Sequence, residues 1–162
     1  MRQMKKLFLL VCIGLLAFLV TTSYSSTQMP QFMLPDAVNG EKVSSSSFEG
    51  KTLLLTFFAT WCPPCLEEIP TLIQLQNEYS DDGFSVIGLS VDQGGPRAVK
   101  RLIEKKSINY PVFMADAQVM EDFGGVYGIP VAFLINKKGN VVKKYTGYVP
   151  KSILVKDLKK IL

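Results

Sequence analysis

The sequence contains no histidine and only three cysteines among its 162 residues. A structural zinc site needs about four Cys or His ligands, and one cysteine, Cys12, lies inside an N-terminal apolar segment. We therefore expect no metal ion and no organic cofactor. The sequence also lacks internal repeats and a glycine-rich phosphate-binding loop, which excludes the common nucleotide-binding patterns.

An excess of charge of either sign is also missing from most of the chain. The formal net charge of +4 comes from 18 basic and 14 acidic residues, and Arg2, Lys5 and Lys6 all lie in the N-terminal segment. The remaining chain is close to neutral, so we expect no nucleic acid among its partners. The hydrophobic fraction of 48% is sufficient for one well-packed core in a single domain.

The N-terminus has the pattern of an export signal. The basic residues precede an uncharged apolar stretch from Leu7 to Val20, and small polar residues follow, with Ser23 and Ser25 suited to a cleavage site. This stretch is short for a bilayer span of about 20 residues. A cleaved signal peptide and a retained membrane anchor are therefore both open.

These features predict the domain organisation. We expect residues 1–25 to be a signal peptide or an N-terminal membrane anchor, residues 26–31 to be a linker, and residues 32–162 to form one domain. Either form of the N-terminus places the domain outside the cytoplasm, in the periplasm or on the outer face of the cytoplasmic membrane. In such a compartment a dithiol either acts as an oxidant or is kept reduced by a dedicated donor.

One motif in the domain points to redox chemistry. Cys62 and Cys65 follow an apolar run from Leu53 to Phe58 and begin a segment with helical periodicity. Residues three apart on a helix have Cβ atoms about 5 to 6 Å apart, and a small local adjustment closes a disulfide between them. A CxxC pair beside a strand-helix-strand pattern indicates a redox-active disulfide, with an inert structural disulfide as the alternative.

The two cysteines are not equivalent. Cys62 precedes the first helical turn, where free backbone N–H groups and the helix dipole stabilise a thiolate, so we expect Cys62 to be the nucleophile. Pro63 and Pro64 fit this turn because their missing N–H groups would have no intrahelical partner. Glu68 shares a helix face with Cys65 and is the candidate proton acceptor for its thiol. The alternative is that Glu68 is a solvated surface residue.

The remaining pattern is typical of an α/β domain. Asn39-Gly40 predicts a hairpin with a type I′ turn between about Phe32 and Val43. Strands are predicted over 52–59, 84–91, 110–114, 131–136 and 141–146, and helices over 63–79, 96–106, 117–123 and 152–162. The strand-helix-strand order predicts a right-handed crossover and therefore a parallel arrangement at the centre of the sheet.

Together these features resemble the thioredoxin superfamily, and within it the exported TlpA/ResA/DsbE-like thiol-disulfide oxidoreductases. The resemblance covers roughly residues 32–162. It rests on Phe58-Ala59-Thr60-Trp61-Cys62, Glu68-Ile69-Pro70, Val91-Asp92, Tyr110-Pro111-Val112, Gly128-Ile129-Pro130, Phe133-Leu134-Ile135 and Gly139. It implies a thioredoxin-like α/β fold, in which helices flank a central mixed sheet, with an N-terminal hairpin and a central insertion.

By position, the resemblance also implies roles for single residues. Cys62 is the attacking thiol and Cys65 the buried resolving thiol. The peptide bond before Pro130 is cis, which places the Ile129 backbone beside the disulfide where it can pair with an extended substrate.

Four further positions follow from the same resemblance. Trp61 and Pro63 join Ile129 and Pro130 as expected substrate-binding residues. Thr56 stands where cytosolic thioredoxins have a buried aspartate, so proton handling is expected to rest on Glu68.

The implied function is reduction of disulfides in exported proteins, for example in cytochrome c maturation. A membrane thiol donor, such as a DsbD/CcdA-like reductase, would return the disulfide to its dithiol form. The protein is expected to be a monomer. A thiol peroxidase is one alternative, although it would have a threonine three residues before its cysteine and Thr60 is only two before Cys62. A non-enzymatic metal chaperone is the other, but it would need His or Met beside the cysteines.

Overall fold

The computed structural model describes residues 27–162, so the expected signal peptide or anchor lies outside the described residues. Five strands form the central sheet in the order β5-β4-β3-β6-β7. They are β3 (Thr52–Phe58), β4 (Phe84–Ser90), β5 (Val112–Met114), β6 (Val131–Ile135) and β7 (Val141–Thr146). β4 pairs in parallel with β3 and β5, whereas β6 pairs antiparallel with β3 and β7. The expected mixed sheet with a parallel centre is confirmed.

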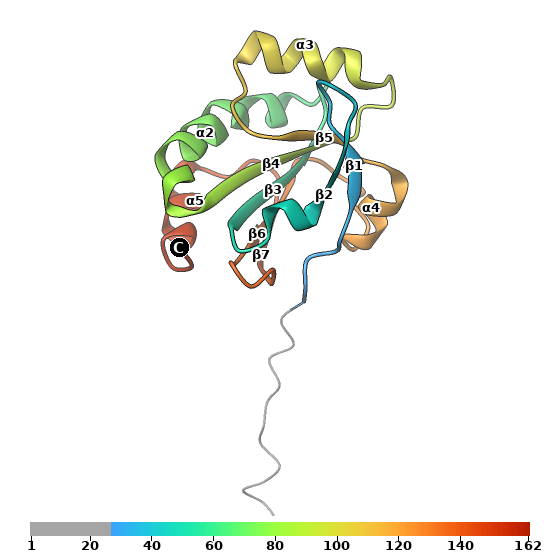
Figure 1. Cartoon of the computed structure of the whole chain (residues 1–162). Coiled ribbons are helices and arrows are strands. Elements are labelled where there is room, and N and C mark those ends of the chain that lie inside the picture. The colour runs from blue at the N-terminus through green and yellow to red at the C-terminus, as the bar shows by residue number, and fades with distance from the viewer. Residues whose placement is uncertain (1–26) are drawn as a thin grey trace, which may run out of the picture.

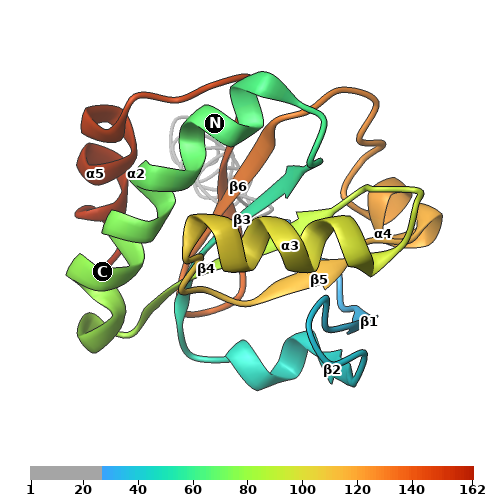
Figure 2. The same ribbon diagram turned by 90° about the horizontal axis from the view of Figure 1, so that it is seen from above.

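Helices cover both faces of this sheet. The α-helices are α2 (Pro63–Tyr79), α3 (Pro96–Lys106), α4 (Ala117–Asp122) and α5 (Lys151–Leu158), and short 3-10 turns form η1 (Ser45–Phe48) and η2 (Ser80–Asp82). Figures 1 and 2 show α2, α3 and α5 on one face, and α4 with the N-terminal hairpin on the other. The alternation of side chains along β3 explains the two layers. Leu54 and Phe58 belong to the core under α2, whereas Leu55 and Phe57 belong to the core under α4.

The N-terminal hairpin is present, but its turn differs from the expected type I′ turn. β1 (Met33–Pro35) pairs antiparallel with β2 (Lys42–Ser44). A type I′ turn needs a positive φ at both central residues, and only Gly40 has one, at 77°. The Asp36 carboxylate accepts hydrogen bonds from the backbone N–H groups of Val38 at 2.7 Å and Asn39 at 3.1 Å. These local bonds stabilise a longer turn.

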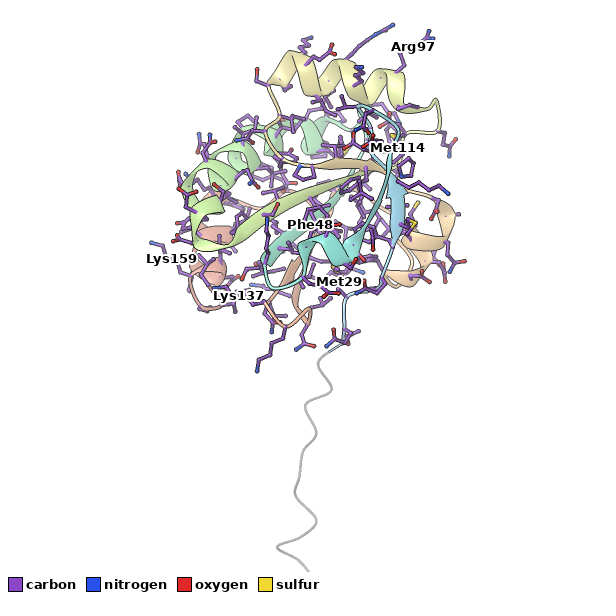
Figure 3. All side chains as sticks on the ribbon, viewed as in Figure 1. Met29, Phe48, Arg97, Met114, Lys137 and Lys159 are labelled. Carbon is purple, nitrogen blue, oxygen red and sulfur yellow. A yellow bond between two sulfur atoms is a disulfide. The ribbon has the colours of Figure 1, made fainter. Side chains whose placement is uncertain are left out.

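The residues expected to be a linker contact the sheet. Met29 N–H donates to the Gly139 carbonyl at 2.8 Å, and Val141 N–H donates to the Thr27 carbonyl at 2.9 Å. The side chain of Met29, which is labelled in Figure 3, is buried. The β6–β7 turn therefore holds the chain in place ahead of the hairpin.

The C-terminal helix is shorter than expected. α5 ends at Leu158 rather than at Leu162. Arg97 of α3 is exposed and points away from the body of the molecule in Figure 3. Between residues 27 and 162, no helix combines the length and apolar character needed to cross a bilayer.

A buried carboxylate joins α5 to β7. Asp157 accepts hydrogen bonds from the Tyr145 hydroxyl at 3.1 Å, from Lys143 Nζ, and from Lys160 Nζ at 2.9 Å. The bond from Lys143 is the largest of several causes that hold the pKa of Asp157 well below its usual 3.8. This group should therefore stabilise the native state in its ionised form.

We expect Asp157→Asn to lower the free energy of unfolding by about 1 to 2 kcal/mol at neutral pH, toward the low end of what hydrogen bonds to a charged group contribute. The lysine side chains are 45% and 61% exposed, so solvent screens their share. Because the native pKa is depressed, this stabilisation is complete above the unfolded pKa and disappears as the pH falls below it. Urea denaturation should show the two proteins converging in acid, and exposed Asp81→Asn is the control. A difference that does not change with pH would contradict the prediction.

Candidate active site

The CxxC motif lies where β3 ends and α2 begins. Cys62 is the N-cap of α2, and prolines occupy the first two helical positions. Cys62 and Cys65 form a disulfide with an S–S distance of 2.06 Å and a Cα–Cα distance of 5.3 Å. The strand therefore delivers Cys62 to the N-terminal end of the helix, where the helix dipole and the Cys65 N–H, the first-turn donor that the two prolines leave, favour an anion.

The residues around the disulfide differ strongly in exposure. Cys62 is 4% exposed and Cys65 is 2% exposed, whereas Trp61 is 66% exposed. Cys65 is buried, as the resemblance implies. Cys62 is also shielded while the disulfide is closed, and the indole of Trp61 is the large apolar surface next to it.

Asp92 binds Thr60, which lies two residues before Cys62. Its carboxylate accepts hydrogen bonds from the Thr60 backbone N–H at 2.9 Å, from the Thr60 hydroxyl, and from the Ser90 hydroxyl at 2.8 Å. Beside it, Val91 N–H donates to the Phe58 carbonyl at 2.9 Å. These bonds tie together the loops that follow two adjacent parallel strands. The sequence pattern contained Val91-Asp92 but did not indicate this role, because Thr60 and Asp92 are 32 residues apart.

Glu68 is buried on the sheet side of α2. It is 4% exposed, and its Oε1 accepts a hydrogen bond from the Val149 backbone N–H at 2.8 Å. Burial raises the pKa of Glu68 above its usual 4.5, and the hydrogen bond from Val149 opposes part of that rise. The neighbouring Glu67 is exposed. The solvated-surface interpretation of Glu68 is therefore wrong.

Tyr110 is the buried neighbour of this carboxylate. Burial is the main cause that raises the pKa of Tyr110, and the charge of Glu68 raises it further. Tyr110 is 8% exposed and lies before β5. Glu68 therefore sits in a buried layer with a neutral phenol.

The peptide bond between Ile129 and Pro130 is cis, as the resemblance implies. It directly precedes β6, and the Pro130 carbonyl accepts a hydrogen bond from Gly147 N–H at 2.8 Å. Pro130 is buried, whereas Ile129 is partly exposed. The segment before β6 therefore exposes Ile129 rather than the proline.

A groove with a volume of about 400 Å³ contains both Trp61 and Ile129 in its walls. The other walls come from the loops after β4 and β5, from α4, and from the segment before Ile129, which includes Tyr127. Tyr127 is 90% exposed. Pro63 and Pro130 do not line this groove, so the structure brings together only two of the four residues expected to bind substrate.

The groove is mainly apolar in character. Of its two carboxylates, Asp92 is bonded to Thr60 and Ser90, and Asp116 accepts a hydrogen bond from Val119 N–H at 2.8 Å at the start of α4.

Sequence reasoning missed Tyr127, and its position next to Gly128-Ile129-Pro130 was the only local signal. Among residues 27–162, no group of three or more His, Cys, Asp or Glu side chains could hold a metal ion.

Comparison with known proteins identifies the family. The model of the Redoxin family matches residues 25–162. The chain belongs to the Redoxin family. Thiol-disulfide oxidoreductase ResA from Bacillus cereus is 31% identical to this Redoxin-family protein over 163 residues, which cover 96% of this chain and 93% of the relative. ResA from Bacillus subtilis is 32% identical over 126 residues, which cover 77% of this chain and 69% of the relative.

Solved structures agree with this assignment. A thioredoxin-family thiol:disulfide interchange protein from Chlorobium tepidum has a TM-score of 0.79 and 34% identity, covering 86% of this chain and 99% of that one. A thiol:disulfide interchange protein from Bacteroides sp. has a TM-score of 0.72 and 25% identity, covering 83% and 88%. The Redoxin-family protein therefore has the expected thioredoxin-like fold and is a thiol-disulfide oxidoreductase of the ResA/DsbE-like group.

Proposed function

We propose that this protein reduces disulfides in exported proteins, such as those handled in cytochrome c maturation. The observation that carries the proposal is the Cys62–Cys65 disulfide at the N-terminus of α2, with a buried carboxylate, Glu68, on the same helix. The likeness to proteins named thiol-disulfide oxidoreductase ResA supports the reaction type. The export pattern before residue 26 is the sequence feature that supports a role among exported proteins.

The proposed reaction transfers two electrons from the dithiol to the substrate. The Cys62 thiolate attacks one sulfur of a substrate disulfide, which forms a mixed disulfide and releases the other substrate sulfur as a thiolate. Cys65 then attacks Cys62 Sγ, which breaks the mixed disulfide and leaves Cys62–Cys65 oxidised. Glu68 accepts the proton that Cys65 loses. A membrane thiol donor, such as a DsbD/CcdA-like reductase, returns the protein to its dithiol form.

The groove beside Trp61 and Ile129 is the proposed binding site for the substrate chain next to its cysteine. Its apolar walls and the exposed rings of Trp61 and Tyr127 suit an extended apolar segment. Pro63, exposed next to Cys62 in the chain, and Pro130, buried after Ile129, are also proposed to take part in substrate binding. The protein acts as a monomer in the periplasm or on the outer face of the cytoplasmic membrane.

The reduction potential of the Cys62–Cys65 couple tests this function. We expect a value more negative than about −230 mV, in the range of thioredoxin-like reductants rather than near the −120 mV of a strong oxidant. The protein is equilibrated in glutathione buffers of stepwise ratio, and its dithiol fraction is measured by alkylation and mass spectrometry. The Cys62→Ser/Cys65→Ser variant provides the background. A potential close to −120 mV would make the protein an oxidant and refute the proposal.

A further inference from the structure

The hydroxyl of Thr56 is buried without a partner. Thr56 is 3% exposed, and within residues 27–162 its Oγ1 is the one buried side-chain nitrogen or oxygen atom with no hydrogen bond. Such a group costs stability because it loses its hydrogen bonds to water. Valine has nearly the same shape and would avoid this loss. The hydroxyl therefore has no role in holding together the disulfide form of the protein.

Thr56 faces the same layer as the active-site helix. Side chains two apart on a strand point to the same face, so Thr56 shares its face with Leu54 and Phe58. Both of these residues belong to the core cluster that contains Cys65 and Leu72 of α2. The Thr56 side chain is therefore directed toward α2 rather than toward α4.

The neighbours of Thr56 in the sheet are small. Thr56 is in register with Gly88 of β4 and with Ala132 of β6. A Cβ atom added to Gly88 would lie 3.5 Å from the ring of Tyr110. Tyr110 belongs to the same core cluster as Cys65, and the charge of Glu68 helps to raise the pKa of Tyr110. The strand neighbour of Thr56 therefore packs against a ring of the core layer that contains Cys65.

Glu68 lies on the same face of α2 as Cys65. It follows Cys65 by three residues and precedes Leu72 by four, so all three lie on one helix face. All three are buried. The strand face that carries Thr56 and the helix face that carries Cys65 and Glu68 meet in the same core layer.

We propose that Thr56 is a positioning residue for proton transfer between Cys65 and Glu68. This inference rests on the function proposed above, in which Cys65 resolves the mixed disulfide. In the closed disulfide neither sulfur is charged and the Thr56 hydroxyl has nothing to bond. In the dithiol form, a thiolate on Cys65 becomes an acceptor for the hydroxyl, directly or through one water molecule.

The step balances without any further reagent. The Cys65 S–H proton passes to the Glu68 carboxylate while a bond forms between Cys65 Sγ and Cys62 Sγ. The bond between Cys62 Sγ and the substrate sulfur breaks, and the electron pair leaves with the substrate sulfur, which takes a proton from solvent. Thr56 is unchanged; its hydroxyl donates to the Cys65 sulfur as the thiolate forms, while Val149 N–H holds the Glu68 carboxylate.

Three other ionisable groups near this layer do not change their protonation state around neutral pH. Burial raises the pKa values of Tyr110 and Tyr145, so both phenols stay neutral. The Tyr145 hydroxyl donates to Asp157, whose pKa is lowered, so that carboxylate stays ionised. Glu68 and the two thiols are the ionisable groups on this side of the sheet that the proton transfer uses. A change in the pH profile can therefore be assigned to them.

The test separates the two chemical steps in the reduced protein with 5,5′-dithiobis(2-nitrobenzoate). Attack by Cys62 releases a first thionitrobenzoate, and resolution by Cys65 releases a second. In stopped-flow measurements across pH 6 to 9, we expect Thr56→Val to slow the second release about threefold or more and to shift its pH midpoint, with the first release unchanged. Thr56→Ser should restore both, and Thr56→Ala should behave like Thr56→Val. The oxidised Thr56→Val protein should be at least as stable as the wild type.

A second release from Thr56→Val with the wild-type rate and pH midpoint would overturn the inference. Equal slowing of both releases would also overturn it, because that indicates a general disturbance of the site. The reduction potential separates this result from the proposed function. An oxidising potential together with slow resolution in Thr56→Val would refute the reductase role and keep the positioning role. A reducing potential with wild-type resolution would do the opposite.

Discussion

Replacing Cys62 with serine is expected to abolish disulfide reduction, whereas replacing Cys65 with serine should leave a protein that traps its substrates. Cys62 caps α2, where the helix stabilises a thiolate, and Cys65 lies one turn further in, at 2% exposure. Loss of the nucleophile should lower the rate of insulin disulfide reduction about 10³-fold or more. Without Cys65 the first attack still occurs, but nothing releases the adduct.

The trapped species can be measured directly. Cys65→Ser is mixed with oxidised insulin, free thiols are blocked in acid, and adducts are identified by non-reducing electrophoresis and mass spectrometry. The Cys62→Ser/Cys65→Ser protein is the control and should form none. Adducts with Cys62→Ser and none with Cys65→Ser would reverse the roles of the two cysteines.

Glu68→Gln is expected to slow resolution of the mixed disulfide about 10-fold or more near neutral pH, in keeping with the loss of a positioned proton acceptor. Gln keeps the size of the side chain, and its carbonyl oxygen can still accept the hydrogen bond from Val149 N–H. It cannot take the Cys65 proton. The pH profile of the second thionitrobenzoate release should therefore lose the contribution of one titrating group.

The stability of this variant should change in the opposite direction to its activity. Because burial raises the native pKa of Glu68 above 4.5, the ionised carboxylate destabilises the fold. This penalty is absent below the unfolded pKa and grows as the pH rises from there to the native pKa. At neutral pH, urea denaturation should give Glu68→Gln a free energy of unfolding equal to or above that of the wild type.

The exposed neighbour Glu67 provides the matched control. Glu67→Gln makes the same chemical change one residue away, on a side chain that faces solvent. It should leave resolution, pH profile and stability at wild-type values. Identical pH profiles for the two variants would show that water, rather than Glu68, accepts the proton.

Local patterns in the sequence were enough to predict the elements and the redox pair. Apolar runs predicted strands at β3, β4 and β6, and these three strands are buried along their whole length. The helix after Cys62 runs over Pro63–Tyr79 as expected. The CxxC spacing predicted the disulfide, because closure depends only on the geometry of one helical turn.

The hairpin turn shows where a local pattern was insufficient. Asn39-Gly40 favours a type I′ turn, but the Asp36 side chain bonds to two backbone N–H groups of the same loop and competes with that geometry. The preference of Asn39-Gly40 for a type I′ turn stabilises the loop less than the hydrogen bonds to Asp36 do. The hairpin was therefore correct, and its turn type was wrong.

The surroundings of the disulfide were decided by the tertiary structure alone. Helical spacing placed Glu68 on the face of Cys65, but periodicity does not reveal which group lies opposite, and its partner Val149 is 81 residues away. The bonds from Thr60 to Asp92 and the unpartnered hydroxyl of Thr56 likewise depend on how separate segments pack. The sequence by itself determined the dithiol chemistry, because Cys62 and Cys65 are only three residues apart in the chain. Packing between distant segments determined which buried groups surround the dithiol, because burial and hydrogen bonding are set only when those segments meet.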